Sequence, residues 1–420
     1  MRVTIFSTFD TFGGASIAAS RLHQALGRHG VQSRMLVQDK KGKAPEVYSV
    51  ANNWVQQKIA LARFAADRYQ FAFYEKSKAV RFVFSQAQIG IDVTSEAVVR
   101  DAEVFHLHWV NFGFLSVKSL TQLSKLNRPF VWTLHDMWAF TGGCHYSGTC
   151  ESYQQSCGNC EHFLKKPSAD DLSHQVWLRK KALFDQMDLT LVACSEWLAE
   201  KARQSSLLQG KKVISIPNPI DTKLFYPQAK TEARQQLNLA QDKQYILFAA
   251  MKISDARKGF QYFEKAIQHL ITQNPSLKDS VELLVMGQAQ EADFVNIPCK
   301  VNVLGRLSDL SKIATTYAAA DVFVIPSLEE NLPNTIMEAM ACGTPVVGFE
   351  TGGIPEMIEH LQTGYVAKAP SAEDLANGIV HILQHPNYEG LCKQARSKVE
   401  SEYAEAVVAK RYETLYQSLL

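Results

Sequence analysis

Short runs of apolar residues alternate with longer amphipathic stretches along the whole chain. In the first half, the apolar runs that predict buried strands fall at residues 2–8, 32–38, 104–110, 129–135, 189–195 and 212–218. In the second half they return at residues 244–251, 281–287, 301–305, 322–327, 344–350 and 364–369. Strands that alternate with helices in this way are typical of a parallel sheet wrapped by helices. The pattern therefore predicts an α/β protein built from two doubly wound units.

The two units are expected to meet at a proline-rich stretch, IPNPIDTKLFYPQAK, which interrupts the alternation. We place the boundaries so that residues 1–225 form the N-terminal domain, 226–400 the second domain and 401–420 a final helix. One face of that helix is apolar, which predicts that it packs against a core. Because ligands bind beyond the carboxyl ends of the strands in such sheets, the two domains are expected to face a substrate cleft.

The composition of the chain excludes some classes of function. The chain has 420 residues, 46% of them hydrophobic, which is enough to fill two cores. A formal charge of +2 argues against a nucleic-acid partner, for which a strongly basic surface is expected. The first residues show no charged leader before a long apolar segment, and no uncharged apolar run reaches about 18 residues. We therefore expect a cytoplasmic protein that acts on small molecules.

Four of the eight cysteines gather in one glycine-rich stretch, GGCHYSGTCESYQQSCGNC, as Cys144, Cys150, Cys157 and Cys160. Their spacing, C-x5-C-x6-C-x2-C in a loop with few apolar residues, is typical of a tetrahedral thiolate site for structural zinc. Free or transiently oxidised thiols and an iron–sulfur cluster are the alternatives. His145 or His162 would also be able to replace one sulfur.

Two glutamates stand eight positions apart in PSLEENLPNTIMEAMACGTPVVGFETGGIPE. Glu330 follows a buried strand, and Glu338 lies in the helix expected after it. A loop carboxylate can accept hydrogen bonds from neighbouring sugar hydroxyls, Glu338 could do the same for a ribose, and the amides of the first helical turn suit phosphates. Gly13 and Gly14 similarly lead from the first strand into a helix, where backbone amides can approach a diphosphate. Each residue also has a structural alternative. Glu330 would be a solvated loop charge, Glu338 a partner of the helix dipole, and the Gly13–Gly14 stretch a plain tight turn.

The segment EENLPNTIMEAMACGTPVVGFETGGIPEMI resembles the E-x7-E signature region of the retaining glycosyltransferase family 4. The segments GGAS, CSEWLAE, IPNPIDTKLFYP, VLGRLS and YAAADVFVIPSLEE are similar to other parts of that family, so the resemblance covers nearly the whole chain. It implies the GT-B architecture, with two Rossmann-like domains and a C-terminal helix that crosses back to the first. It also implies transfer of a sugar from a UDP- or GDP-sugar to a glycan or lipid-linked oligosaccharide in bacterial surface polysaccharide synthesis. Some bacterial members that build exopolysaccharide or colanic-acid-type polymers are similar in carrying a cysteine-rich insert.

The resemblance also implies roles for individual residues. Glu330 would contact the transferred sugar, Lys258 would neutralise the leaving diphosphate, and His135 would face the donor sugar. The other residues implied to bind the donor are Gly13, Gly14, Arg257, Arg306, Asn331, Leu332 and, at the ribose, Glu338. The chain departs from the family in AAMKISDARKGF, where Lys252 or Arg257 stands in for the usual diphosphate-binding arginine. No Asp-x-Asp motif occurs, so a catalytic divalent ion is not implied.

Residues 53–84 interleave aromatic side chains with lysine and arginine. Such a segment could rest on anionic lipid headgroups at the inner face of the plasma membrane, or hold a lipid-linked acceptor. The alternative is a pair of ordinary helices whose basic side chains extend into water.

Two other functions of the chain also stay open. The same fold hosts sugar-nucleotide epimerases and phosphorylases, and a non-catalytic zinc-containing binding module would leave the two-glutamate region without a role.

Overall fold

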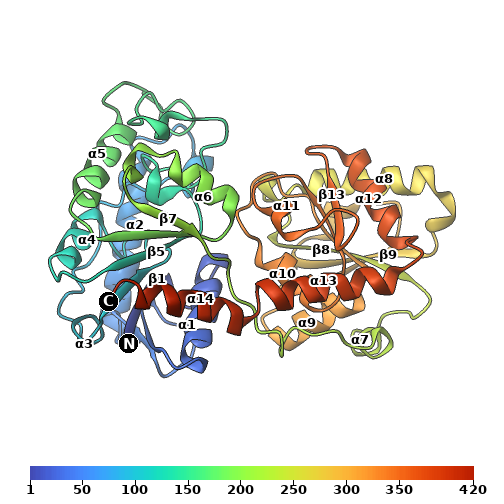
Figure 1. Cartoon of the computed structure of the whole chain (residues 1–420). Helices are drawn as coiled ribbons and strands as arrows, with labels where there is room; N and C mark the ends of the chain where they lie inside the picture. The colour runs from blue at the N-terminus through green and yellow to red at the C-terminus, as the bar shows by residue number, and fades with distance from the viewer. The chain divides into compact units, whose positions relative to one another are not determined.

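The computed structural model describes residues 1–420, and the chain divides into two compact units (Figure 1). Unit 1 comprises Met1–Asn218 and Val408–Leu420, and unit 2 comprises Pro219–Val407. Each unit contains one sheet, and all of the strand pairs within the two sheets are parallel. The α/β class with two doubly wound sheets, predicted from the spacing of the apolar runs, is confirmed.

Unit 1 has a seven-stranded sheet in the order β3-β2-β1-β4-β5-β6-β7. Its strands are β1 (Arg2–Phe9), β2 (Gln32–Asp39), β3 (Val47–Ser49), β4 (Val104–Leu107), β5 (Phe130–Leu134), β6 (Leu189–Ala193) and β7 (Lys212–Ser215). Its helices are α1 (Gly14–Arg28), α2 (Trp54–Ala72), α3 (Ala97–Arg100), α4 (Val117–Ser124), α5 (Leu172–Phe184) and α6 (Glu196–Arg203), together with most of α14 (Glu405–Gln417). The strand order reverses between β1 and β4, and such a reversal opens a crevice beyond the carboxyl ends of the two strands.

Unit 2 has a six-stranded sheet in the order β10-β9-β8-β11-β12-β13. Its strands are β8 (Gln244–Lys252), β9 (Val281–Gln288), β10 (Val301–Gly305), β11 (Val322–Ile325), β12 (Val346–Phe349) and β13 (Gly364–Ala367). Its helices are α7 (Lys230–Gln236), α8 (Phe260–Gln273), α9 (Leu310–Ala319), α10 (Asn334–Ala341), α11 (Ile354–Met357), α12 (Ala372–Leu383) and α13 (Tyr388–Glu402). Helices α8 and α12 pack together on one face of the sheet, and α9, α10 and α13 lie on the other (Figure 1). Here the order reverses between β8 and β11.

The last helix, α14, completes the core of unit 1. Its Val408, Tyr412 and Tyr416 are buried in one cluster with apolar residues of β1, β2 and α1. The cluster also contains a hydrogen-bonded chain, because the Tyr416 hydroxyl lies 2.6 Å from Nδ1 of His106 and the Tyr412 hydroxyl lies 2.8 Å from Oγ1 of Thr133. The final helix is therefore bound to unit 1 by polar contacts as well as by apolar packing.

The division between the units falls at Asn218 and Pro219, seven residues before the boundary placed after residue 225. The intervening segment belongs to unit 2 because its backbone is bound there: Ile220 N–H donates to the Tyr403 carbonyl at 2.9 Å, and Arg396 donates to the carbonyl oxygens of Thr222 and Phe225. The second division follows Val407 rather than residue 400, because α13 continues to Glu402 and the Glu405 N–H donates to the Ile220 carbonyl of unit 2 at 3.2 Å. None of the helices is both long enough and apolar enough to span a membrane.

Candidate active site

Glu330 and Lys258 form an ion pair in unit 2, although they are 72 residues apart in the chain. Lys258 ends a short 3-10 turn, Ala256–Lys258, which follows β8. Glu330 lies in the loop that joins β11 to α10. The Lys258 side chain is 26% exposed and the Glu330 side chain 10% exposed, so the pair is partly shielded from water. The strand-order reversal thus brings together the carboxylate predicted for the sugar and the cation predicted for the diphosphate.

Two glycines allow the loops around this ion pair to approach each other. At Gly259, where φ is +70°, a Cβ atom would lie 1.9 Å from the carbonyl oxygen of Pro326. At Gly352, where φ is +56°, a Cβ atom would lie 1.6 Å from the carbonyl oxygen of Glu330. Both distances are far shorter than any non-bonded contact, and both φ values favour glycine. The backbone position of Glu330 therefore depends on glycine at residue 352.

Arg257 lies against the same loop. Its Nη1 donates to the carbonyl oxygen of Glu329 at 3.3 Å, and its Nη2 lies 3.5 Å from Oδ2 of Asp255. Burial raises the pKa of Glu329, the neighbouring Glu330 adds to that increase, and Arg257 opposes it. Lys252, the other candidate for a second cation, is exposed at the end of β8. Arg306 is also exposed, directly after β10.

Glu338 lies on α10 and is 9% exposed. Its Oε2 accepts a hydrogen bond of 3.2 Å from the hydroxyl of Tyr317, a buried residue of α9. Asn331 and Leu332, also predicted at the donor, are buried between Glu330 and α10. No role for Tyr317 was predicted. The only signal was its place in YAAADV, at the end of a helix that leads into β11.

The glycine turn after β1 is built as the sequence predicts, at the amino end of α1. Gly13 is the N-cap of α1, with φ +85° and ψ 159°, and Gly14 is the first helical residue. A Cβ atom on Gly13 would have no neighbour within 4 Å, so the backbone conformation rather than crowding favours glycine there. An open helix amino end of this kind suits an anion.

In unit 1, His135 follows β5 and forms a hydrogen bond with His108, which follows β4. The distance from Nε2 of His135 to Nδ1 of His108 is 2.8 Å. Burial lowers the pKa of His135 to about 4, although nearby Asp136 opposes the decrease. Burial also lowers the pKa of His108 well below its usual value. Both imidazoles are therefore neutral near pH 7, and one ring nitrogen donates to the other.

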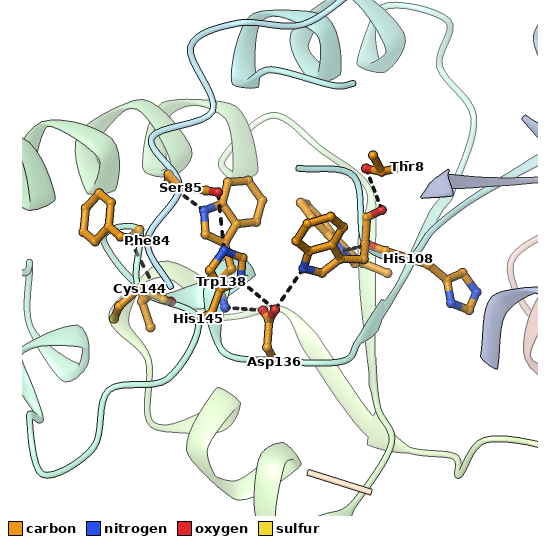
Figure 2. Close-up of polar contacts among 12 residues, drawn as sticks. Thr8, Phe84, Ser85, His108, Asp136, Trp138, Cys144 and His145 are labelled. Carbon is orange, nitrogen blue, oxygen red and sulfur yellow. Dashed lines mark hydrogen bonds and ion pairs between the residues drawn. The ribbon is translucent and has the colours of Figure 1, made fainter. Parts of the chain in front are cut away.

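Asp136 directly follows His135 in the chain, and its carboxylate binds His145 of the cysteine-containing loop (Figure 2). Its carboxylate lies 2.6 Å from Nδ1 of His145, and it accepts hydrogen bonds from the Trp109 indole at 3.1 Å and the Trp138 backbone N–H at 2.8 Å. Burial alone would raise the pKa of Asp136, but His145 and the N–H donors lower it below its usual value. The sequence did not predict this group of contacts.

Asp136, His145 and Ser85 resemble a hydrolase triad, because Nε2 of His145 lies 3.3 Å from the Ser85 hydroxyl. The serine side chain is fully buried, and its oxygen also accepts a hydrogen bond from Arg68 at 3.3 Å. A nucleophile must be reachable by its substrate and free of a competing cationic donor. The arrangement is therefore structural: it holds the segment before Ser85 against the loop after Asp136.

The four clustered cysteines line one pocket, together with His162 and Phe163. All four are free thiols, and the backbone N–H of Gly142 donates to Sγ of Cys157 at 3.1 Å. Burial raises the pKa of Cys144, and it raises the pKa values of Cys157 and Cys160 to about 12 and about 11. No three or more His, Cys, Asp or Glu side chains are arranged so that they could hold a metal ion as they stand. The predicted cysteines are thus brought to one pocket, and the predicted metal geometry is not formed.

Comparison with protein families matches both halves of the chain. The model for "Glycosyltransferase Family 4" matches residues 12–224, and the model for "Glycosyl transferases group 1" matches residues 243–385. The putative colanic acid biosynthesis glycosyl transferase WcaC of Escherichia coli (strain K12) is 26% identical over 86% of this chain and 85% of its own length. Several other curated relatives are matched over a smaller part: the chain spans between 44% and 61% of their lengths.

Solved structures agree in fold. Sucrose-phosphate synthase from Thermosynechococcus elongatus superposes with a TM-score of 0.69 over 100% of this chain and 98% of its own, at 21% identity. The complex of Anabaena Alr3699/HepE with UDP-glucose superposes with a TM-score of 0.65 over 100% of both chains, at 16% identity. At these identities the superpositions establish the fold alone.

Proposed function

The chain belongs to glycosyltransferase family 4, and from this premise we propose that it transfers a sugar from a nucleoside-diphosphate sugar to a glycan or lipid-linked acceptor, with retention at the anomeric carbon. Family membership confirms the resemblance that was noted in the sequence. Retention and the donor class are supported by that membership. The bound UDP-glucose of the Anabaena structure supports UDP-glucose as the first donor to test.

The observation that carries the proposal is the ion pair between Lys258 and Glu330, next to the strand-order reversal of unit 2. In the absence of donor, each charge neutralises the other. A bound diphosphate would attract Lys258 and release Glu330 to accept hydrogen bonds from hydroxyls of the sugar. The pair therefore prepares both groups for the donor, and it keeps these two charges compensated until the donor arrives.

The proposed chemistry is a single displacement on one face of the sugar. The bond from C1 to the diphosphate oxygen breaks, and its electron pair stays on the leaving diphosphate. Lys258 and Arg257 stabilise that developing charge, together with backbone amides at the amino ends of α1 and α10. The acceptor hydroxyl attacks from the same face and passes its proton to the departing diphosphate oxygen. Glu338 holds the ribose, with Tyr317 fixing its carboxylate.

His135 is proposed to position the donor sugar by hydrogen bonding. Its lowered pKa means that it acts as a neutral donor or acceptor near pH 7 and not as a cation. The remaining predicted contacts, Gly13, Arg306, Asn331 and Leu332, belong to the same proposal. Of the two candidates for the second cation, Arg257 is favoured over Lys252 because its guanidinium already contacts the Glu330 loop.

The setting is proposed to be bacterial surface polysaccharide synthesis at the inner face of the plasma membrane. The colanic acid relative and a lipopolysaccharide 1,2-N-acetylglucosaminetransferase of Salmonella typhimurium support the polysaccharide. An N,N'-diacetylbacillosaminyl-diphospho-undecaprenol alpha-1,3-N-acetylgalactosaminyltransferase of Campylobacter jejuni supports a lipid-linked acceptor. No observation favours an epimerase, a phosphorylase or a non-catalytic binding module.

A structural zinc ion in the cysteine loop is part of the proposal, without a role in the transfer. Four thiols around one pocket, and an amide that donates to the Cys157 sulfur, fit a thiolate zinc site, although the side chains would have to close around the ion. Metal analysis should find about one zinc ion per chain. The double variant Cys157→Ser/Cys160→Ser should lose it, while Cys392→Ser should keep it. A metal-free wild type with four titratable thiols would refute the zinc site.

The transfer is tested first by donor binding. Thermal unfolding of the purified protein should be measured with UDP-, GDP-, ADP- and CMP-sugars. A donor at about 100 times its Kd should stabilise unit 2 by about 2.7 kcal/mol, which is about 5–10 °C in Tm. Glu338→Ala should abolish the shift, and Glu350→Ala, which removes an exposed carboxylate of the same unit, should retain it. Binding that is equal in both variants would contradict the proposed ribose contact.

A further inference from the structure

Helix α2 and the segment after it expose an unusual amount of apolar surface. Of the 19 exposed large hydrophobic side chains in the chain, nine fall within residues 54–83. Those nine are Trp54, Val55, Ile59, Leu61, Tyr69, Phe73, Tyr74, Phe82 and Val83. Single exposed apolar side chains need no explanation, but a gathering of this kind marks an interaction site.

Most of the exposed side chains of α2 share one side of the helix. Positions 54, 55, 58, 59 and 69 recur at helical spacing, and Phe73, the C-cap residue, continues the same row; we call this side the outer face of α2. The opposite side packs into unit 1 through Ala60, Asp67, Arg68 and Phe71, all of which are buried. The inner side is thus packed against unit 1, whereas the apolar side chains of the outer face stay exposed.

The aromatic rings of the outer face are highly exposed. Trp54 is 69% exposed, Tyr69 is 68% exposed and Phe73 is 56% exposed. The rings of Tyr69 and Phe73 contact each other edge to face, with centroids 5.1 Å apart. Tryptophan and tyrosine combine an apolar ring with a polar group, which suits them to the boundary between lipid and water.

The exposed charges of this segment are all positive. Lys58, on the outer face, and Lys76 and Lys78, which follow the helix, are exposed. The two acidic residues within 53–84 are buried and bound: Asp67 pairs with Arg68, and Glu75 pairs with Arg81. The segment therefore presents apolar side chains and cations to solvent, and this combination is complementary to anionic lipid headgroups.

We propose that the outer face of α2, with Lys58 and Lys78, docks the protein on the surface of an anionic lipid bilayer. The aromatic side chains would enter the headgroup region, and the lysines would contact the anionic headgroups. The inference deepens the proposed function by naming the surface that brings the enzyme to a lipid-linked acceptor. Its test measures binding without donor or acceptor, so it succeeds or fails independently of the transfer reaction.

The test is co-sedimentation of the full chain with vesicles of phosphatidylcholine alone and with vesicles that contain about one third phosphatidylglycerol. The wild type should bind the anionic vesicles and be released by high salt. Trp54→Ser/Phe73→Ser should weaken that binding at least about tenfold, because two large side chains lose their burial in the headgroup region. The matched control, Leu178→Ser/Val295→Ser, removes exposed apolar side chains elsewhere and should bind as the wild type does.

A second pair of variants tests the charge. Each lysine near an anionic surface contributes about fivefold to binding, so Lys58→Glu/Lys78→Glu should weaken it by about 25-fold or more. Lys118→Glu/Lys278→Glu makes the same change of net charge at other exposed positions and should have a much smaller effect. All four double variants alter exposed side chains, and their thermal unfolding should match that of the wild type.

Two results would overturn the proposal. The first is wild-type binding to anionic vesicles that neither outer-face variant reduces. The second is an absence of vesicle binding. Sedimentation velocity then measures whether the chain is a monomer or a dimer. A wild-type dimer that Trp54→Ser/Phe73→Ser dissociates would assign the outer face to a second copy of this chain, and a monomer would leave it to a protein partner.

Discussion

Replacing Lys258 by methionine tests the proposed mechanism at its main point. The substitution keeps most of the aliphatic stem and removes the ammonium group that pairs with Glu330. The carboxylate, whose side chain is 10% exposed, then has no cation in its ion pair. We expect two separable effects: a loss of stability without donor, and a larger loss of turnover with donor.

The loss of stability follows from the burial of the pair. Breaking a fully buried pair costs about 3–5 kcal/mol, and breaking an exposed one costs about 0.2–1 kcal/mol. With side chains 26% and 10% exposed, this pair lies between the limits, and we expect a loss of about 1–2 kcal/mol. In a unit the size of Pro219–Val407, that corresponds to about 2–8 °C in Tm. The double variant Lys258→Met/Glu330→Gln should recover part of the loss, because it leaves no unpaired charge.

The loss of turnover should be larger, because a fixed charge on the leaving group acts mainly in the transition state. Removing one such group typically costs about 100- to 1000-fold in kcat. The assay is release of nucleoside diphosphate by slow donor hydrolysis, which needs no identified acceptor. Lys252→Met, six residues earlier and exposed, is the control and should hydrolyse donor at a rate within a few fold of the wild type. Wild-type turnover in a folded Lys258→Met protein would refute the assigned role.

Three further predictions concern the residues around the sites. Tyr317→Phe should cost about 1 kcal/mol of stability and weaken donor binding, because it removes the hydroxyl that fixes Glu338. Urea denaturation measures the stability, and calorimetric titration with the donor measures the affinity. Gly352→Ala should destabilise unit 2 by more than about 3 kcal/mol, since its Cβ would lie 1.6 Å from a carbonyl oxygen. Gly210→Ala has a similar positive φ but no neighbour within 4 Å, so it should lose only about 1 kcal/mol; equal urea-denaturation losses would show that crowding is unimportant. His135, whose folded pKa is about 4, binds a proton less readily than in the unfolded chain, so its contribution is a loss of stability as pH falls from about 6.5 toward 4. The slope should be up to about 1.4 kcal/mol per pH unit and smaller in His135→Gln, and an unchanged slope in urea denaturation would contradict this.

Twelve of the thirteen strands, and with them the class of fold, were predictable because each leaves a local mark, a short apolar run bounded by turn residues. The exception is β3, Val47–Ser49, which is only three residues long and leaves no such run. The boundary between the units was less predictable. Residues 219–225 look like a linker in the sequence, and only the contacts of Arg396 and Tyr403 assign them to unit 2. Those contacts join residues more than 170 positions apart, and no local pattern records them.

The candidate site shows the same limit. Glu330 and Lys258 were predicted singly from the resemblance, but their ion pair depends on two loops that meet only because β8 and β11 are neighbours. Tyr317 has an ordinary helical context, so its hydroxyl contact could not be predicted. The cysteine spacing predicted a tetrahedral thiolate site for zinc, and the structure places the four thiols around one pocket without forming that geometry. The zinc ion itself stays a prediction.

The place of α14 in the core of unit 1 has a consequence for how the protein is made. Unit 1 is completed by Val408–Leu420, while all of unit 2 is encoded between its two parts. During synthesis, the nascent first 218 residues must therefore wait for the whole of unit 2 before Tyr412 and Tyr416 can reach Thr133 and His106. Unit 2 is continuous in the chain and can fold as it leaves the ribosome. We therefore expect unit 2 to complete its core before unit 1 does, although most of unit 1 is synthesised first.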